Sequence, residues 1–267
     1  MGEYKVARAR LTRAMSHHTH LGEVWNAVPS GRLCVPKALV GPNGYGMLIA
    51  TEVGEIPDEM PLLLGEMLYQ LRSALDACIY QGAVHATKKD PPEGEGKFEF
   101  PITVDPNEWT SLKKRRLFAL PVSIQDAIER AQPYNNQFLP PGELITSVNR
   151  NLGILHDWAR KDRHRRLHVV GSWPIHLNPE FVLPDGAVVD WVDIMTPATF
   201  TDGAVMAKFH ISGYGPGTDA QVNPRLRTTL GCNEPPIPCD PSDTLERRLM
   251  GMVNSVAGVI DYFERNL

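Results

Sequence analysis

Hydrophobic positions recur every three or four residues in several stretches of the chain, which is the spacing of an amphipathic α-helix. The first such stretch runs from Glu3 to Ala27, the second from Leu62 to Val84, and the last from Asp243 to Asn266. Ser123 to Ala131 is shorter and begins with a serine suited to cap a helix N-terminus. Leu144 to Ala159 carries apolar residues on one further helical face. The spacing therefore predicts a chain rich in helix.

Short apolar runs bounded by turn residues predict β-strands between these helices. Leu33 to Val40 and Met47 to Val53 flank a Gly-Pro-Asn-Gly-Tyr-Gly segment, whose Asn43-Gly44 pair suits the positive φ of a hairpin turn. Phe98 to Val104 is predicted to be a strand or an extended segment. Further strands are expected later in the chain, at Phe181 to Leu183, Ala187 to Ile194 and Val205 to Ile211.

The order of these elements predicts an α+β fold, with amphipathic helices packed on an antiparallel β-sheet. No internal repeat or low-complexity linker divides the sequence, so residues 1–267 are expected to form a single domain. Within it, residues 60–170 form a helical core with the motif segments, residues 171–235 are β-rich, and residues 243–266 form the closing helix.

Composition narrows the classes of protein to which the chain belongs. Charged residues make up 22% and hydrophobic residues 42% of the sequence, as in globular proteins, and the net charge of -4 argues against non-specific nucleic-acid or membrane binding. No apolar run approaches the roughly 18 residues of a membrane-spanning helix, and the N-terminus has no apolar signal core. Because the cysteine spacing matches no common zinc site, no metal or cofactor is expected. We expect a soluble, cytoplasmic protein without membrane association.

The densest run of ionisable residues lies between Ile154 and Val170 and reads ILHDWARKDRHRRLHVV. Apolar residues are interspersed with its charges, so some of the charges are expected to point inward. Arg72 lies at the edge of the apolar face of the second long helix, one turn before Asp76. An unpaired buried charge is costly, so charges from both stretches are expected to pair between two packed helices. The expected cluster contains Arg72, Asp76, Asp162 and either Arg165 or Arg166.

Two interpretations of this cluster are open. In the favoured one it is a structural ion network that fixes the register of two helices, since such networks perturb residues without performing chemistry. In the other it is a polar site in which His164 or His168 acts as acid or base while an arginine holds an anion.

Four segments between about residues 60 and 170, reading GEMLYQLRSALDACIY, FPI, IERAQPY and LHDWARKDRHRRLH, resemble a widespread group of uncharacterised bacterial proteins. That group has a Gly-Asp-x-Leu-His-x-Leu-Arg-Ser-Ala-Leu-Asp-His helix, a Phe-Pro-Ile strand, a Gln-Pro-Tyr turn and an Asp-Lys-His-Arg segment. This chain departs from the pattern at Glu66, Tyr69, Ala77 and Arg163, which stand for Asp, His, His and Lys. The resemblance implies no established activity, and the missing histidines weaken the case for a catalytic base on this helix.

The spacing of Arg163 and His168 resembles the motif of HEPN-type ribonucleases, an arginine followed by four to six residues and a histidine. The resemblance implies phosphodiester cleavage, in which arginine neutralises phosphate and histidine moves a proton. Against it, Leu167 to Val170 is predicted to begin a strand, and Ala77 stands where a histidine would follow Arg72. The alternative function is therefore a HEPN-like ribonuclease or phosphodiesterase that uses Arg163 with His164 or His168.

The remaining charged positions are assigned to the protein surface. His17, His18 and His20 are interpreted as a solvated helix end, because alternate residues diverge on a helix. The basic runs Lys113 to Arg116 and Arg160 to Arg166 offer phosphate contacts, but the acidic total disfavours nucleic acid as a partner. The apolar face of the last helix leaves open either internal packing or a homodimer.

Overall fold

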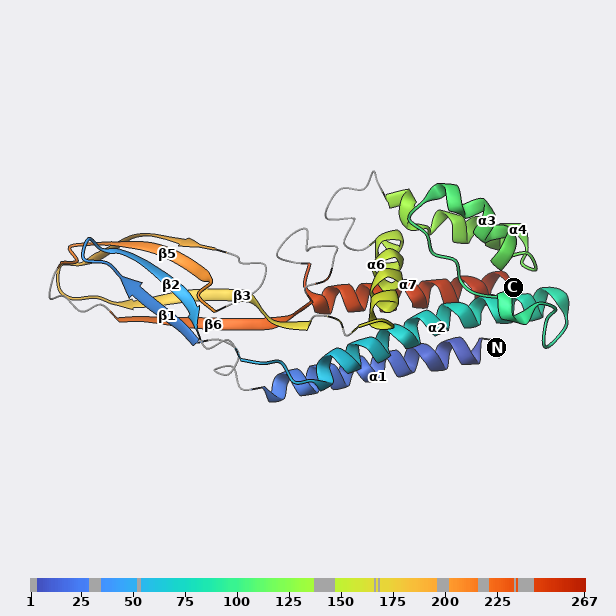
Figure 1. Ribbon diagram of the computed structural model, residues 1–267, viewed down its shortest axis with the longest axis horizontal. Coiled ribbons are helices and arrows are strands. Elements are labelled where there is room, and N and C mark those ends of the chain that lie inside the picture. Colours follow the sequence, from blue (N-terminus) through green and yellow to red (C-terminus); the bar gives the residue numbers. More distant parts are fainter. Residues whose placement is uncertain are drawn as a thin grey trace. The chain divides into compact units, whose positions relative to one another are not determined.

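The structure is a computed structural model that describes residues 4–28, 35–51, 54–136, 147–165, 167, 169–195, 202–215, 221–232, 234 and 243–267. It combines helices with antiparallel strands, which confirms the predicted α+β class (Figure 1). The chain divides into two compact units that are described separately. The helical unit comprises Met1–Gly22, Pro61–Leu167 and Glu234–Leu267, and the β unit comprises Glu23–Met60 and His168–Asn233. The expectation of a single domain stays a prediction.

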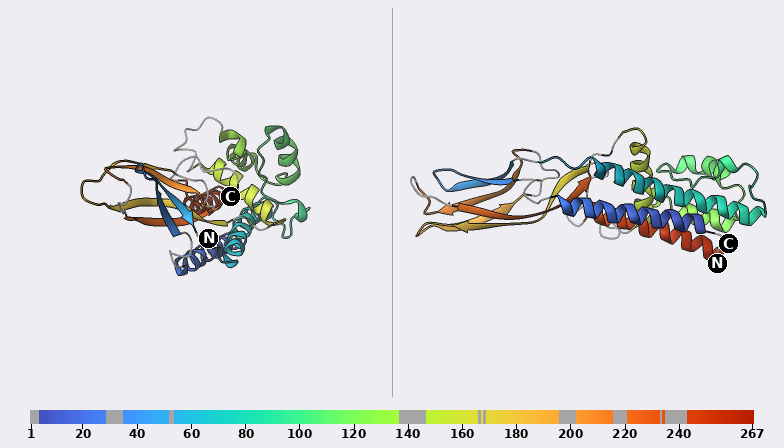
Figure 2. Two further views of the ribbon diagram at one scale, coloured as in Figure 1. Left: turned by 60° about the vertical axis from the view of Figure 1, so that its left-hand side comes forward. Right: turned by 90° about the horizontal axis from the view of Figure 1, so that it is seen from below.

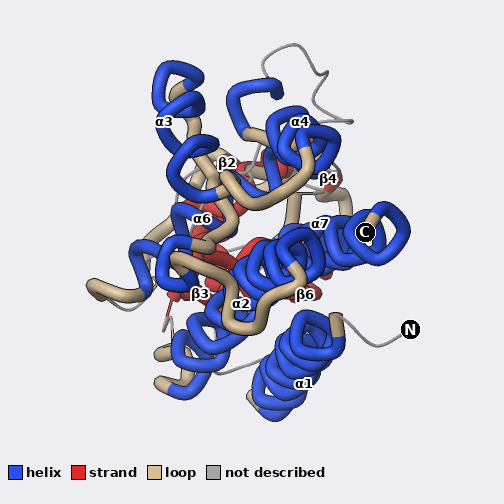
Figure 3. Tube along the Cα trace, turned by 90° about the vertical axis from the view of Figure 1, so that its right-hand side faces the viewer, coloured by secondary structure: helices blue, strands red, loops and turns tan. Residues whose placement is uncertain are grey.

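Long helices form most of the helical unit. Helices α1 (Lys5–Ala27), α2 (Glu59–Thr87) and α7 (Leu245–Asn266) run alongside one another, and α6 (Val148–Asp162) crosses them steeply (Figure 1 and Figure 2). Figure 3 shows α1, α2 and α7 almost end-on. The apolar stripe of α2 is fully buried, as the three-and-four spacing predicted. Hydrophobic burial therefore holds this bundle together, and the predicted long helices are confirmed.

The described part of the helical unit also contains two shorter helices, α3 (Pro106–Arg116) and α4 (Val122–Arg130), and the single turns Glu95–Lys97 and Pro133–Asn136. Helix α3 begins after Asp105, whose side chain accepts a hydrogen bond from the backbone N–H of Asn107. The predicted cap at Ser123 is wrong, because Pro121 holds the capping position and Ser123 lies inside the first turn of α4. Residues 98–104 are an extended segment and not a strand.

The β unit contains a four-stranded antiparallel sheet in the order β1-β2-β5-β4. These strands are β1 (Val35–Val40), β2 (Tyr45–Thr51), β5 (Val205–Ser212) and β4 (Val188–Ile194). The predicted hairpin is confirmed: Gly44 has a φ of 79°, and a Cβ at this position would overlap the backbone carbonyl of Ile211. Here only glycine fits both the turn and the neighbouring strand.

A second, two-stranded sheet pairs β3 (Val169–Val182) with β6 (Gln221–Cys232). The sequence predicted only the two ends of β3 and none of β6. Both strands contain proline, and Pro179 pairs with Pro224 in the register. Proline argues against a central strand but is tolerated at a sheet edge, and each strand of a two-stranded sheet has a free edge. The start of β3 at Val169 agrees with the strand expected there.

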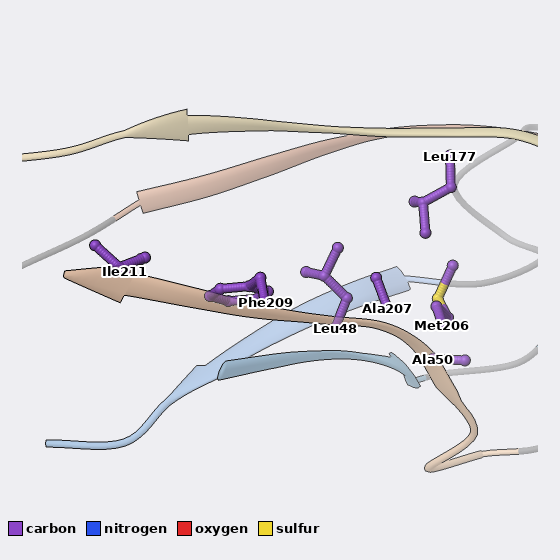
Figure 4. Close-up of a cluster of buried hydrophobic side chains, with 7 residues drawn as sticks. All are labelled: Leu48, Ala50, Leu177, Met206, Ala207, Phe209 and Ile211. Atoms are coloured by element: carbon purple, nitrogen blue, oxygen red, sulfur yellow. The ribbon is translucent and has the colours of Figure 1, made fainter. Parts of the chain in front are cut away.

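Alternating side chains of β2 and β5 form the core of the β unit. Figure 4 shows Leu177 of β3 reaching toward them from the second sheet. The cluster consists of Leu48, Ala50, Leu177, Met206, Ala207, Phe209 and Ile211. A strand points successive side chains to opposite faces of the sheet, which explains why the buried residues alternate. Within the described ranges, no helix is both long and apolar enough to cross a membrane.

Candidate functional site

Arg72 and Asp76 lie side by side on α2, as their spacing predicted. Both also contact the extended segment formed by residues 98–104. The Arg72 guanidinium lies 3.5 Å from the Asp76 carboxylate and 3.4 Å from that of Glu99, and it donates to the backbone carbonyl of Phe100. The N–H of Phe100 donates in return to Asp76, at 2.9 Å. Burial raises the pKa of Asp76, while Arg72 and the Phe100 N–H oppose the rise. We call Arg72, Asp76, Glu99 and Phe100 the clasp; it ties residues 98–104 to α2.

The other end of the extended segment is held by Gln132, which is fully buried. Its amide donates to the carbonyls of Pro101 and Ile128, at 2.9 and 3.0 Å, and accepts from the N–H of Thr103. Side chains thus satisfy backbone groups that strand pairing would otherwise have to satisfy. This explains why residues 98–104 stay extended without joining a sheet.

His156 on α6 lies in the field of the clasp. Burial, followed by the charges of Arg72, Arg160 and Arg163, lowers its pKa to about 4. The imidazole is therefore neutral at pH 7. Its Nδ1 and the Nη1 of Arg72 are both buried without a hydrogen-bond partner in the described part of the chain. Arg163 also acts on Asp76, so this predicted site residue does lie near the clasp.

The other predicted residues at the end of α6 are not part of the clasp. Arg165 forms a bidentate ion pair with the buried Glu234, at 2.6 and 2.8 Å, so it does not join the clasp. Arg163 and His164 are exposed. The predicted positions Arg166 and His168 lie outside the described residues.

Asp162 faces a cavity between α1, α2 and the end of α6. The cavity has a volume of about 420 Å³ and is lined by Arg13, His17, Gly65, Glu66, Tyr69, Gln70 and Asp162. The Asp162 carboxylate fills the space that a Cβ on Gly65 would need. Asp162 therefore does not join Arg72 in the clasp. Its carboxylate packs against Gly65 of α2 instead.

His17 is the buried titratable group of this cavity, with an exposed fraction of 8%. Its Nδ1 lies 3.1 Å from a carboxylate oxygen of Glu66, which is close enough for an ion pair when the imidazole is protonated. Burial lowers the pKa of His17, and Glu66 opposes this only in part. The interpretation of His17 as part of a solvated helix end is wrong, because α1 packs this side of the helix against α2.

Asp162 is shifted in the opposite direction. Burial raises the pKa of its carboxyl group, and among the described residues no hydrogen bond or ion pair offsets that burial. One cavity thus contains a histidine whose pKa is lowered and a carboxyl group whose pKa is raised. Environments that push two pKa values in opposite directions are typical of acid–base sites.

A basic groove adjoins the cavity along α1. It is lined by Lys5, Val6, Ala9, Arg10, Arg13 and Gln70, and it shares Arg13 and Gln70 with the cavity. Arg10 donates to Gln70 at 3.0 Å, and its guanidinium lies 5.9 Å from the centre of the Tyr69 ring. Positive side chains therefore lead toward the side of the cavity where His17 lies, one turn after Arg13.

Sequence reasoning missed His17 and the role of Gly65. The one available signal was a glycine in the interior of a strong helix, which costs stability unless close packing requires it. Within the described ranges, no group of three or more His, Cys, Asp or Glu residues is placed to hold a metal ion. Comparison with protein-family models, curated proteins and solved structures found no match for this chain.

Proposed function

We propose that the cavity containing His17 and Asp162 binds a small phosphate ester, and that these two side chains move protons in its hydrolysis. A single observation carries the proposal: one cavity of about 420 Å³ contains a buried histidine beside Glu66, a carboxyl group that has no partner among the described residues, and the guanidinium of Arg13. This volume lies within the range of about 300 to 1,000 Å³ that is usual for small-molecule sites.

The charges around the cavity favour an anionic ligand of limited size. Arg13 is positioned at the junction of cavity and groove, and Lys5 and Arg10 extend the positive potential along α1. Tyr69 has 59% of its surface exposed and offers a ring face on which a planar base can stack. The net charge of -4 disfavours a long polyanion, so a nucleotide-sized phosphate ester fits better than a nucleic-acid strand.

Each side chain has a defined part in the proposed reaction. Nε2 of His17 accepts a proton from a water molecule as the water oxygen bonds to phosphorus. The bond between phosphorus and the leaving oxygen breaks, and protonated Asp162 gives its proton to that oxygen. A proton then returns from His17 to Asp162 through solvent. Arg13 balances the phosphate charge.

The clasp keeps the structural role that we favour for it. Arg72 has an exposed fraction of only 7%, and its Nη2 faces the Asp76 carboxylate, the Glu99 carboxylate and the Phe100 carbonyl together. Removing one member would leave a buried charge unpaired, which costs about 3 to 5 kcal/mol. On this interpretation the clasp holds α2 and the 98–104 segment, and the chemistry takes place at the neighbouring cavity.

The test is hydrolysis of a panel of nucleoside monophosphates, cyclic nucleotides and dinucleotides by the parent protein and by His17→Gln, Asp162→Asn and Arg13→Gln. The control is His18→Gln, because His18 lies next to His17 on α1 but bonds the exposed Glu246. We expect kcat to fall by about 10² to 10⁴-fold in His17→Gln and to be unchanged in the control. Equal turnover by His17→Gln and the parent protein would refute the proposal.

A ribonuclease that uses Arg163 is the second candidate function. The observation that favours it is the crowding of Arg160 and Arg163 around neutral His156, with Arg163 and His164 both exposed. Cleavage of single-stranded RNA would be compared in Arg163→Gln, His164→Ala and His168→Ala, with His17→Gln as the discriminating variant. Loss in the first set alone would assign cleavage to the end of α6. Undiminished cleavage in all of them would exclude it.

A further inference from the structure

A second cavity of the helical unit lies between α4, the start of α6 and α7. Its volume is about 320 Å³. Mostly apolar residues line it: Phe100, Ala127, Ile128, Arg130, Ala131, Val148, Ser255, Gly258, Val259, Tyr262 and Phe263. None of these residues lines the His17 cavity or its basic groove, so substitutions at one site leave the lining of the other unchanged. We call this second cavity the α7 groove.

Few polar groups of the α7 groove are free to meet a ligand. The Ser255 hydroxyl already donates to the carbonyl of Gly251 and accepts from the side chain of Asn151. By contrast, the Arg130 guanidinium and the Tyr262 phenol make no hydrogen bond or ion pair within the described part of the chain. The groove therefore combines apolar walls with one uncompensated cation and one free hydroxyl donor.

We propose that the α7 groove binds an apolar monocarboxylate, such as a medium-chain fatty acid, with its carboxylate at Arg130 and its chain along α7. A single guanidinium matches one carboxylate in charge and in its two-pronged hydrogen-bonding geometry. The apolar walls gain free energy by covering a hydrocarbon chain, whereas they would only desolvate a second charge. A volume near the lower end of the usual range for ligand sites suits a chain of moderate length.

Gly258 provides a direct way to close the groove. A Cβ built on Gly258 meets no atom within 4 Å, although this residue lies in the middle of α7 and lines the groove. The Cβ of a leucine at this position therefore meets no neighbour, and leucine favours a helix more than glycine does. Gly22→Leu is the matched control, because Gly22 on α1 is exposed and equally open but does not line the groove.

The experiment measures binding of decanoate below its micelle concentration by isothermal titration calorimetry, with the full chain and with each variant. We expect saturable binding to the parent protein and to Gly22→Leu, and at least a tenfold loss in Gly258→Leu. Arg130→Gln should weaken decanoate by about tenfold while leaving decan-1-ol unchanged, because only the carboxylate uses the cation. Thermal melts of each variant would verify that the fold is kept.

Several outcomes would overturn the proposal. One is the lack of decanoate binding, and another is equal binding by Gly258→Leu and the parent protein. Equal affinity for decanoate and decyltrimethylammonium would show that the groove binds any apolar chain and does not recognise a carboxylate. A concentration-dependent dimer in gel filtration that Gly258→Leu abolishes would identify a second copy of the chain as the occupant instead.

Discussion

Replacing Asp243 with alanine tests how the helical unit holds α6 against α7. Asp243 precedes α7 and its side chain is fully buried. It receives the guanidinium of Arg150 from α6 at 2.5 Å and that of Arg248 from α7 at 2.7 and 2.9 Å. The helix that carries Arg150, α6, ends at Asp162, which lines the His17 cavity.

The magnitude follows from the burial of all three side chains. Without Asp243, both guanidinium groups lose their carboxylate while their side chains stay no more than 7% exposed. Breaking a buried ion pair in this way costs about 3 to 5 kcal/mol, and the loss of one carboxylate by two buried guanidinium groups favours the upper part of that range. The loss is large against a typical total stability of about 5 to 15 kcal/mol.

The pH dependence gives a second signature. Burial alone would raise the pKa of Asp243, but the hydrogen bonds and charges of Arg248 and Arg150 outweigh it and hold the pKa at about 2. A carboxyl group with a lowered pKa stabilises the folded state fully above its ordinary value of 3.8, and this contribution is lost as the pH falls through 2. The difference between Asp243→Ala and the parent protein should therefore shrink between about pH 4 and pH 2.

Equilibrium urea denaturation followed by circular dichroism measures the effect. Asp261→Ala is the control, because Asp261 also pairs with an arginine, Arg8, but both side chains are about 40% exposed. We expect the control to lose less than about 1 kcal/mol. If Asp243→Ala costs no more than Asp261→Ala, the reasoning from burial is refuted.

Further predictions concern the cavity, the neutral histidine and the clasp. Gly65→Ala should destabilise the fold, although alanine is favoured over glycine in helices by about 1 kcal/mol, because its methyl group overlaps Asp162. In an Asp162→Ala background the same change should stabilise the fold. Additive effects of the two substitutions in a double-mutant cycle, measured by urea denaturation, would contradict this prediction. The pKa of His156 is lowered from 6.5 to about 4, so stability should be complete above pH 6.5 and fall by about 3 kcal/mol toward pH 4, an effect that His156→Gln should remove. Asp76→Ala should free the N–H of Phe100 and speed its amide hydrogen exchange, whereas unchanged protection would contradict the role of the clasp.

Local patterns predicted the elements whose causes are local. Helices α1, α2 and α7 follow from apolar residues at helical spacing, and the β1–β2 hairpin follows from Asn43-Gly44, because each pattern depends only on neighbours along the chain. The middle of β3 and all of β6 escaped prediction, because their prolines are tolerated only at the edges of a sheet. That edge position is a property of the assembled sheet.

The candidate site divides in the same way. The sequence by itself determined that Arg72 and Asp76 lie side by side, because four residues make one turn of a helix. Only the tertiary structure decided that Asp162 rests on Gly65, and that the side of α1 carrying His17 is buried against Glu66. Those contacts join α1, α2 and α6 across long stretches of chain, and a residue's burial depends on which helices pack beside it. Periodicity therefore predicts which face of a helix is apolar, whereas the environment that shifts the pKa values of His17 and Asp162 exists only once the helices have packed.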